Sequence, residues 1–234
     1  MSVSFDFSDR VAIVTGASGA LGSAVVDAFR DAGATVAAVD LVAPEEDDSL
    51  LDPDEGTDFY EADLTDEDQV AGMVEDVVDD HGQVDHLLNV AGTWRGGTPI
   101  EETDLDTYRF LLDVNLTSAF LTSKHALPHL QDREGSIVSV SARSSLEGGE
   151  SDGPYRASKA GIRILTETLA EENLGTVRAN CVMPSVLDTP MNREMMDYSE
   201  EWVDPADVAT TILALCSEAT PVTSGAAVPV YGEA

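Results

Sequence analysis

Lysine is almost absent from this sequence. Only Lys124 and Lys159 occur among 234 residues, whereas 45 residues are Asp or Glu, so the formal net charge is −33. This charge repels the phosphates of nucleic acids and anionic membrane surfaces, and neither is expected as a partner. Because the acidic residues are spread along the chain rather than gathered in one tail, we predict a solvated acidic surface.

Cysteine and long apolar runs are also scarce. The two cysteines, Cys181 and Cys216, lie in apolar patterns and are predicted to be buried free thiols; neither a disulfide framework nor a metal site is expected. No apolar run reaches the roughly 18 residues of a membrane-spanning helix. The first residues lack the basic and apolar regions of a secretion signal. We therefore expect a soluble, cytoplasmic protein without a metal.

Short apolar runs alternate with helical patterns along the whole chain. The runs predicted as strands cover residues 10–15, 33–40, 58–63, 84–92, 135–141, 176–183 and 226–230. One long helix is predicted after Asp104, with Asn115 inside it, and residues 184–201 are predicted to be irregular. The alternation predicts a single α/β domain over residues 1–234, with about seven strands in a doubly wound parallel sheet and helices on both faces.

A glycine-rich turn, Gly16 to Gly22, follows the first predicted strand and leads into a helix. This order predicts a dinucleotide site, because glycine lets the backbone approach a pyrophosphate and a helix N-terminus attracts its charge. The second strand ends at Asp40, whose carboxylate can bond the adenosine ribose and would repel a 2′-phosphate. No basic residue lies in the turn or just after Asp40, so we predict NAD rather than NADP.

Tyr155 and Lys159 are four residues apart and share one face of a predicted helix. A phenol has an ordinary pKa of about 10, and a nearby ammonium lowers that pKa. The pair is therefore a candidate proton donor and acceptor. A surface pair without a role would have the same spacing, so the prediction depends on the motifs around it.

These motifs resemble the short-chain dehydrogenase/reductase family over nearly the whole chain. The turn ending at Gly22 is similar to its glycine motif, with Ala20 at a usual glycine, and Asn89 to Gly92 is similar to its NNAG turn. Tyr155 and Lys159 match its YxxxK pair. Residues 180–189 are similar to its NxxxPGxxxT segment, with Ser185 in place of glycine.

The resemblance implies roles for these residues. Tyr155 would be the general acid/base, Lys159 would bind the nicotinamide ribose and lower the tyrosine pKa, and Asn115 would belong to a proton relay. The family also implies a homodimer or homotetramer. The cofactor-binding residues that it implies, besides Tyr155 and Lys159, are Gly16, Ser18, Ala20, Leu21, Gly22, Asp40, Asp63, Leu64, Asn89, Ala91, Gly92, Pro184, Val186 and Thr189.

One departure from the family concerns its catalytic serine, which lies 13 residues before the tyrosine and is Ala142 here. Ser141 should point to the opposite face of its strand. Ser144 and Ser145 lie beyond the strand end and would have to fold back. The substitutes considered are therefore Ser141, Ser144 and, less directly, Ser145.

Residues 19–23, 90–97 and 187–193, with Trp202, resemble the quinonoid dihydropteridine reductase branch of this superfamily. That branch keeps the Tyr/Lys pair and lacks the serine, which offers a reason for its absence here. Trp94 could stack on a flat ring, and Asn192 and Arg193 could bond a polar substrate edge. These three residues, under a lid at about 184–202, are the predicted substrate contacts. Packing or a solvated loop would explain them equally well.

Two alternatives stay open for the function. The substrate is a dihydropterin-like ring, or a ketone or secondary alcohol handled without the usual serine. A non-catalytic NAD-binding sensor or scaffold is the alternative from another class. The acid-rich, lysine-poor composition resembles that of proteins from salt-loving organisms, where a Debye length of about 3 Å in 1 M salt screens the repulsion.

Overall fold

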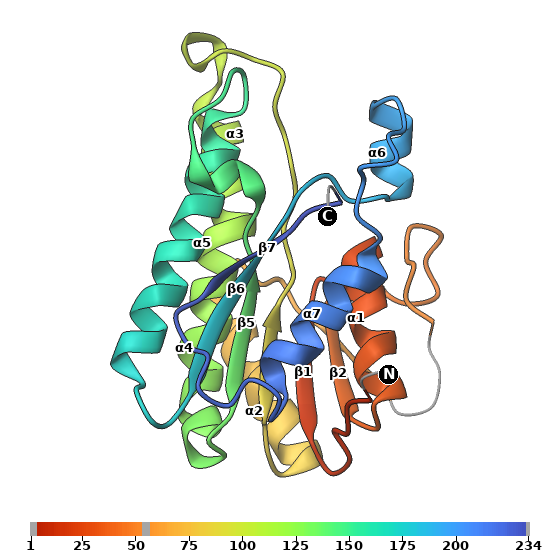
Figure 1. Ribbon diagram of the computed structural model, residues 1–234, viewed down its shortest axis with the longest axis vertical. Helices are drawn as coiled ribbons and strands as arrows, with labels where there is room; N and C mark the ends of the chain where they lie inside the picture. Colours follow the sequence, from red (N-terminus) through yellow and green to blue (C-terminus); the bar gives the residue numbers. More distant parts are fainter. Residues whose placement is uncertain (1–3, 53–56, 233–234) are drawn as a thin grey trace.

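Parallel strands form the centre of the protein (Figure 1). The computed structural model describes residues 4–52 and 57–232. Within these ranges seven strands pair in the order β3-β2-β1-β4-β5-β6-β7. The strands are β1 (Val11–Thr15), β2 (Thr35–Asp40), β3 (Thr57–Glu61), β4 (His86–Asn89), β5 (Ser136–Val140), β6 (Arg178–Pro184) and β7 (Ala227–Val230). The predicted parallel α/β fold is confirmed. Residues 53–56, between the second and third predicted strands, lie outside the described residues.

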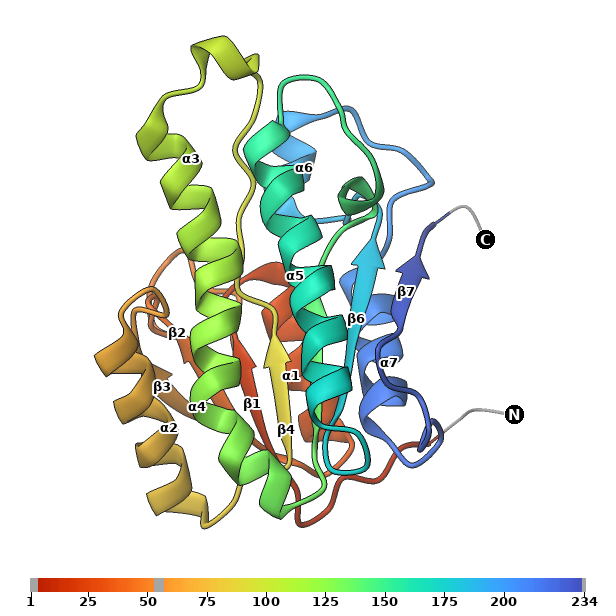
Figure 2. The same cartoon turned by 90° about the vertical axis from the view of Figure 1, so that its left-hand side faces the viewer.

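Helices cover both faces of this sheet. The helices are α1 (Ala20–Asp31), α2 (Glu67–His81), α3 (Leu105–Leu112), α4 (Ser118–Asp132), α5 (Gly153–Glu172), α6 (Pro190–Met195) and α7 (Pro205–Cys216). Helices α2, α4 and α5 lie on the face turned to the viewer in Figure 2, and α1 and α7 lie behind the sheet. None of the helices in the described ranges has the length and apolar character needed to cross a bilayer.

The two faces of the sheet build two apolar cores, because successive strand residues point to opposite sides. Val14 of β1 packs in one cluster with Val25 of α1 and Ile212 of α7. Its neighbour Ile13 packs in the other cluster, with Leu121 of α4. The side chains of Val14, Val25, Ile212 and Ile13 are fully buried. The strands therefore carry continuous apolar runs, as expected for a sheet covered on both faces.

Acidic residues cap three of the helices. Asp66 accepts the N–H groups of Asp68 and Gln69 at the start of α2. Asp104 caps α3 and Asp204 caps α7 in the same way. Each carboxylate satisfies N–H groups that the helix itself leaves unbonded and lies at the positive end of the helix dipole.

Two predicted elements differ from the structure. The long helix expected after Asp104 is divided into α3 and α4 by a π-helical turn, η2 (Asp113–Thr117), which contains Asn115. Residues 184–201, predicted to be irregular, contain the short helix α6, where Thr189 accepts the N–H of Asn192 and Pro190 occupies the first turn. Short 3-10 turns also occur at η1 (Ile100–Glu102) and η3 (Arg143–Leu146).

Asp85 connects the amino ends of β1 and β4 through hydrogen bonds. Its side chain is only 1% exposed, and it accepts hydrogen bonds from the N–H of Val11 at 2.9 Å, from Arg10 at 2.9 Å and from Arg133 at 3.2 Å. Gln83 donates a further bond at 2.8 Å. Burial alone would raise the pKa of Asp85, but the bonds from Val11, Arg10 and Arg133 together hold it below its ordinary value. This carboxylate therefore joins β1 to the segment entering β4.

The strand order reverses direction at the centre of the sheet. From β1 the chain runs outward through β2 to β3, and it then returns to the other side of β1 to form β4. The loops that follow β1 and β4 therefore diverge and leave a crevice at the carboxyl edge of the sheet, which is where ligands bind in this architecture.

Candidate active site

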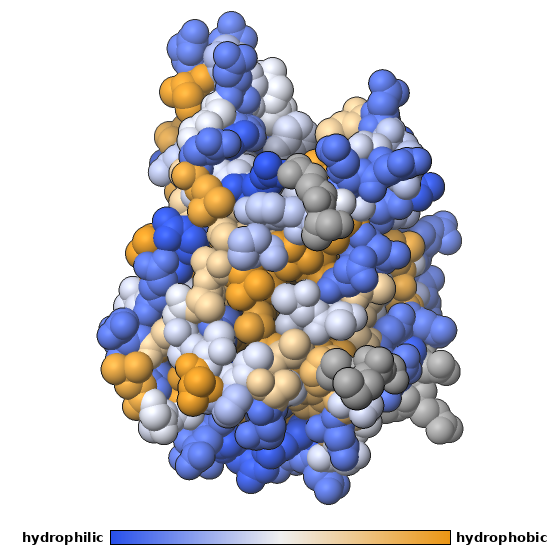
Figure 3. All heavy atoms as spheres, in the orientation of Figure 1, coloured by the Kyte–Doolittle hydropathy of each residue, from blue (hydrophilic) through white to orange (hydrophobic). Residues whose placement is uncertain are grey.

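A cleft of about 1720 Å³ occupies this carboxyl edge. In Figure 3 the outline of the molecule is notched there between two projections, which Figure 1 identifies as the α3 side and the α6 side. Small-molecule pockets are usually about 300–1,000 Å³. The cleft is therefore large enough for a dinucleotide and a second small molecule together.

The glycine turn after β1 forms one wall of the cleft. Gly16 has φ +67°, and a Cβ atom there would lie 2.7 Å from the Cα of Ala91. A Cβ atom on Gly22 would lie 1.8 Å from the carbonyl oxygen of Gly16. Both positions therefore require glycine.

The first turn of α1 faces the same space. Gly19 precedes the helix and no side chain caps it, while Ala20, Leu21 and Gly22 line the cleft. The first N–H groups of a helix have no partner within the helix and attract anions. The predicted pyrophosphate site thus has the backbone approach and the donors that a dinucleotide needs.

Two carboxylates lie beyond the glycine turn, on the β2–β3 side of the cleft. Asp40 accepts the N–H of Ser18 at 2.9 Å and that of Leu41 at 2.7 Å. Asp63 accepts the N–H and the hydroxyl of Thr65 at 2.9 and 2.7 Å. Asp40, Ser18, Asp63 and Leu64 all line the cleft, so this half of the cleft carries two carboxylates.

Tyr155 and Lys159, on successive turns of α5, lie in the other half of the cleft. The Lys159 side chain is buried, and its Nζ donates to the carbonyl oxygen of Val140 at 3.0 Å. Burial lowers the pKa of Lys159 to about 8. Burial, followed by the charge of Asp152, raises the pKa of Tyr155 to about 12, with Arg156 acting weakly in the opposite direction.

The prediction that Lys159 lowers the pKa of Tyr155 is therefore wrong for this structure. Desolvation of the phenol is the larger effect, and the lysine ammonium is bonded to Val140. At neutral pH the phenol is therefore protonated.

Asn115 lies behind this pair and does not line the cleft. Its Oδ1 accepts the N–H of Thr93 at 2.7 Å, and its Nδ2 donates to the carbonyl oxygen of Thr93 at 3.1 Å and to Ser158 at 3.0 Å. A Cβ atom on Gly92 would lie 2.8 Å from Asn115 Oδ1 and 2.9 Å from Lys159 Nζ. Asn115 thus fixes the turn after β4 against Lys159, and its π-helical turn is of a kind common at functional sites.

Asn89 also lies outside the cleft lining. Its side chain is buried, accepts the Thr122 hydroxyl at 2.6 Å and donates to Ser123 at 3.0 Å and Ser139 at 3.3 Å. It therefore joins β4 to β5 and α4, whereas Val90, Ala91 and Gly92 of the same turn line the cleft. The sequence reasoning did not foresee a related contact, in which the Thr15 hydroxyl accepts the N–H groups of Val90 and Ala91.

The three serines near Ala142 have different surroundings. Ser141 donates to the carbonyl oxygen of Lys159 at 2.8 Å. Ser145 is buried, donates to the Met183 sulfur at 3.7 Å and does not line the cleft. Ser144 lines the cleft beside Ala142, and its backbone carbonyl accepts a bond from Arg156 at 3.4 Å. Of the three serines, Ser144 is therefore the one whose hydroxyl forms none of these hydrogen bonds.

Two of the three predicted substrate contacts line the cleft. Trp94 is 42% exposed and lines the cleft, as does Asn192, whose Nδ2 donates to the carbonyl oxygen of Leu187 at 2.8 Å. Arg193 does not line it: its guanidinium bonds Asp188 at 2.5 and 2.6 Å and stacks on Tyr198. The structure thus brings Trp94 and Asn192 to the cleft and turns Arg193 away.

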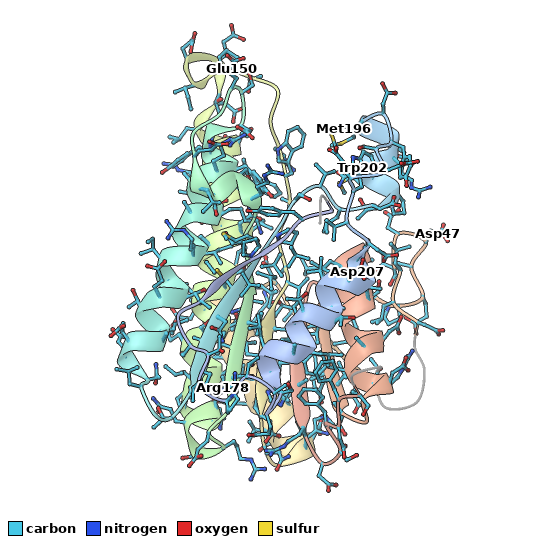
Figure 4. The ribbon with its side chains drawn as sticks, viewed as in Figure 1. Asp47, Glu150, Arg178, Met196, Trp202 and Asp207 are labelled. Carbon is cyan, nitrogen blue, oxygen red and sulfur yellow. The ribbon has the colours of Figure 1, made fainter. Side chains whose placement is uncertain are left out.

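An apolar group at the mouth was not among the predicted contacts. Trp202 and Met196 lie beside α6 near the opening (Figure 4), and Met191 and Met195 line the cleft with them. The methionine-rich composition of residues 184–201 was the available signal, because methionine is common at adaptable binding surfaces. Pro184, Val186 and Thr189 also line the cleft, as predicted.

Neither cysteine takes part in the site. Cys181 and Cys216 are free and buried, as predicted. Burial raises the pKa of Cys181 to about 11 and that of Cys216 to about 12. Both thiols are therefore protonated and unreactive at neutral pH.

Comparison with known proteins agrees with this geometry. The sequence profile of the family described as enoyl-(acyl carrier protein) reductase matches residues 16–232. The chain is 33% identical to 3-oxoacyl-(acyl-carrier-protein) reductase FabG of Thermotoga maritima over 241 residues, covering 95% of this chain and 96% of that protein. It is 31% identical to meso-2,3-butanediol dehydrogenase of Serratia marcescens over 240 residues, covering 97% and 95%.

A solved structure shows the same likeness in three dimensions. The ligand-free aldohexose dehydrogenase of Thermoplasma acidophilum superimposes with a TM-score of 0.86 at 27% identity, covering 97% of this chain and 94% of that one. This structure and the two sequence relatives are all named as dehydrogenases or reductases. The glycine turn, the carboxylates and the Tyr155–Lys159 pair occupy one cleft in this fold, and the chain belongs to the short-chain dehydrogenase/reductase family of oxidoreductases.

Proposed function

We propose that the protein is an NAD(H)-dependent oxidoreductase that acts on a small substrate. The observation that carries the proposal is the cleft itself, in which an anion-attracting glycine turn and Asp40 lie at one end and Tyr155 with Lys159 at the other. A bound nicotinamide supplies or accepts the hydride. The residues of this chain bind and orient both molecules and move the proton.

Each end of the cleft has its own task in this proposal. The N-terminus of α1 binds the pyrophosphate and Asp40 binds the adenosine ribose. Lys159, held by Val140, binds the second ribose, and Tyr155 donates its phenolic proton to the substrate during reduction. Residues 184–202 act as a lid, because α6, the methionines and Trp202 cover one side of the opening.

For the substrate we propose a ketone or secondary alcohol, with a dihydropterin-like ring as the second candidate. The relatives include dehydrogenases named for butanediol and for L-fucose, which favours the first. Ala142 in place of the family's serine and Trp94 at the cleft favour the second. Turnover of a panel of ketones, alcohols and quinonoid pterin with NADH or NAD in molar salt tests both. NADH binding without turnover on any of them would indicate a non-catalytic sensor or scaffold.

The cofactor preference follows from charge. Among the described residues that line the cleft, the basic ones are Arg143, Arg156 and Lys159, all from the segment after β5 or from α5. Among these described lining residues, therefore, no cation lies on the Asp40 side of the cleft to receive a 2′-phosphate. Placing two negative charges together costs several kcal/mol, so we expect kcat/KM for NADH to exceed that for NADPH by about 10²-fold or more.

Asp40→Ala tests this expectation. The variant should lose most of that preference, mainly through better use of NADPH, as steady-state kinetics with both cofactors will show. Asp31→Ala makes the same charge change at an exposed position at the end of α1 and should keep the preference. An Asp40→Ala enzyme that still discriminates against NADPH as strongly as the parent would contradict the assignment.

Ser144 is the proposed replacement for the missing serine. If its hydroxyl bonds the substrate oxygen, Ser144→Ala should lower kcat by about 10²-fold, and adding Ala142→Ser should recover much of the rate. Ser145→Ala, which removes a hydroxyl bonded to Met183 outside the cleft, is the control and should leave kcat within about twofold. Full activity of Ser144→Ala would mean that Tyr155 alone suffices, which favours an electron-poor ring as substrate.

We further propose that the protein works in a salt-rich cytoplasm as a homodimer or homotetramer. The excess of 45 acidic over 12 basic residues supports the first part, because concentrated salt screens the resulting repulsion. The family resemblance supports the second. Light scattering and activity across a salt series would test both parts.

A further inference from the structure

Ser185 combines a buried hydroxyl with a position on the cleft. It follows the last residue of β6, and its N–H donates to the carbonyl oxygen of Val230 at 3.1 Å. Its Oγ is buried and has no hydrogen-bond partner. The other described side chains with such an atom are Arg30, Thr57, His86 and Arg163. None of these four lines the cleft, whereas Ser185 does.

An unbonded, buried hydroxyl destabilises a folded protein, so such groups usually have a partner or a function. At Ser185 the backbone does not need the side chain, because the family motif has glycine there. The hydroxyl lies in a site built to receive a ligand, and a ligand is the partner that would satisfy it.

The position of Ser185 indicates which part of a bound dinucleotide its hydroxyl would contact. A dinucleotide lies across the crevice with its two halves on opposite sides of the switch point. The glycine turn and Asp40 bind the pyrophosphate and adenosine on the β1–β2 side. The end of β6 is on the opposite side, together with Tyr155, Lys159 and the carbonyl of Val140. Ser185 therefore lies in the nicotinamide half.

We propose that the Ser185 hydroxyl binds the carboxamide of the nicotinamide ring. A hydroxyl both donates and accepts, and a carboxamide offers an acceptor oxygen and a donor nitrogen. The contact adds an anchor for the ring that the glycine of the family motif cannot provide. This inference rests on the proposed NAD site and identifies a cofactor-binding residue within it.

Binding of two ligands separates the proposal from its alternatives. Calorimetric titration of Ser185→Ala should give a Kd for NADH raised about five- to tenfold, which corresponds to one lost neutral hydrogen bond. The Kd for ADP-ribose, which has both riboses and the pyrophosphate but no nicotinamide, should stay within twofold. The melting temperature of the free variant should equal or exceed that of the parent, because an unbonded buried hydroxyl has been removed.

Thr57→Val is the matched control, since it removes another buried, unpartnered hydroxyl, at the start of β3 and outside the cleft. It should leave both dissociation constants unchanged. Ser185→Gly, which installs the family residue, is the second variant should Ser185→Ala fold poorly, and the same shift is expected.

An NADH Kd within twofold of the parent would overturn the proposal. Equal weakening of NADH and ADP-ribose would also overturn it, because the contact would then be to a ribose or phosphate. Failure of the parent protein itself to bind NADH would instead refute the proposed function.

Discussion

Tyr155→Phe is expected to lower kcat by about 10³-fold while the Kd for NADH changes less than about threefold. The phenol is the proposed proton donor at the cleft, and general acid catalysis contributes about 10²–10⁴-fold to a rate. Phenylalanine keeps the ring and removes only the hydroxyl, so the helix and the cofactor site should be preserved. Single-turnover kinetics with the best substrate of the panel, alongside fluorescence titration of NADH, measures both quantities.

Tyr108→Phe is the matched control for this experiment. Tyr108 is 42% exposed on α3 and does not line the cleft, so its variant should retain the parent rate. If Tyr155→Phe keeps turnover within a few-fold of the parent, the proton comes from another group and the assignment of Tyr155 is wrong.

Among the substitutions proposed here, Asp85→Ala is expected to lower the free energy of unfolding most, by about 3 kcal/mol. The substitution leaves the buried N–H of Val11 unbonded and separates Arg10 and Arg133 from their shared partner. The two arginine side chains are about 40% exposed and their guanidiniums regain water, which keeps the loss below that of a fully buried ion pair. Urea unfolding in molar salt measures the difference.

The same variant gives a pH signature. The pKa of Asp85 is lower in the folded protein than its ordinary value of about 4. Its stabilising contribution is therefore complete above that value and is lost as the pH falls through the folded pKa. The difference between parent and Asp85→Ala should be constant from pH 8 to about 5 and shrink in more acidic solution.

Asp106→Ala is the control for the urea unfolding of Asp85→Ala and for its pH dependence. Asp106 forms an exposed pair with Arg109 at 3.8 Å, and surface pairs of this kind are worth about 0–1 kcal/mol. An equal loss in the Asp85 and Asp106 variants would show that the buried network does not hold the sheet together.

The sequence contained enough to predict the fold and the two ends of the cleft. Gly16 and Gly22 occur between a strand pattern and a helix pattern, and the structure shows that each lies too close to backbone for any side chain. Asp40 closes a buried strand and was placed correctly at the edge of the sheet. These features depend on neighbours in the chain, which a local pattern records.

Other features depend on contacts between distant segments, and local patterns could not reveal them. The pKa of Tyr155 depends on how deeply α5 is buried, and Lys159 is bonded to Val140 of another element. Asn115 was expected inside a continuous helix, but it lies in a π-helical turn and its side chain fixes the turn at Thr93. Arg193 was expected at the substrate and instead pairs with Asp188, because the chain turns back between them.

The burial of Lys159 also determines how this protein can be attached to a surface or a dye. Of its two lysines, Lys159 is buried in the wall of the cleft, and Lys124 lies on α4 with 49% of its side chain exposed beside Glu67. An amine-reactive reagent therefore meets one exposed side-chain amine, and it lies outside the cleft lining. Conjugation at Lys124 would leave the cleft open.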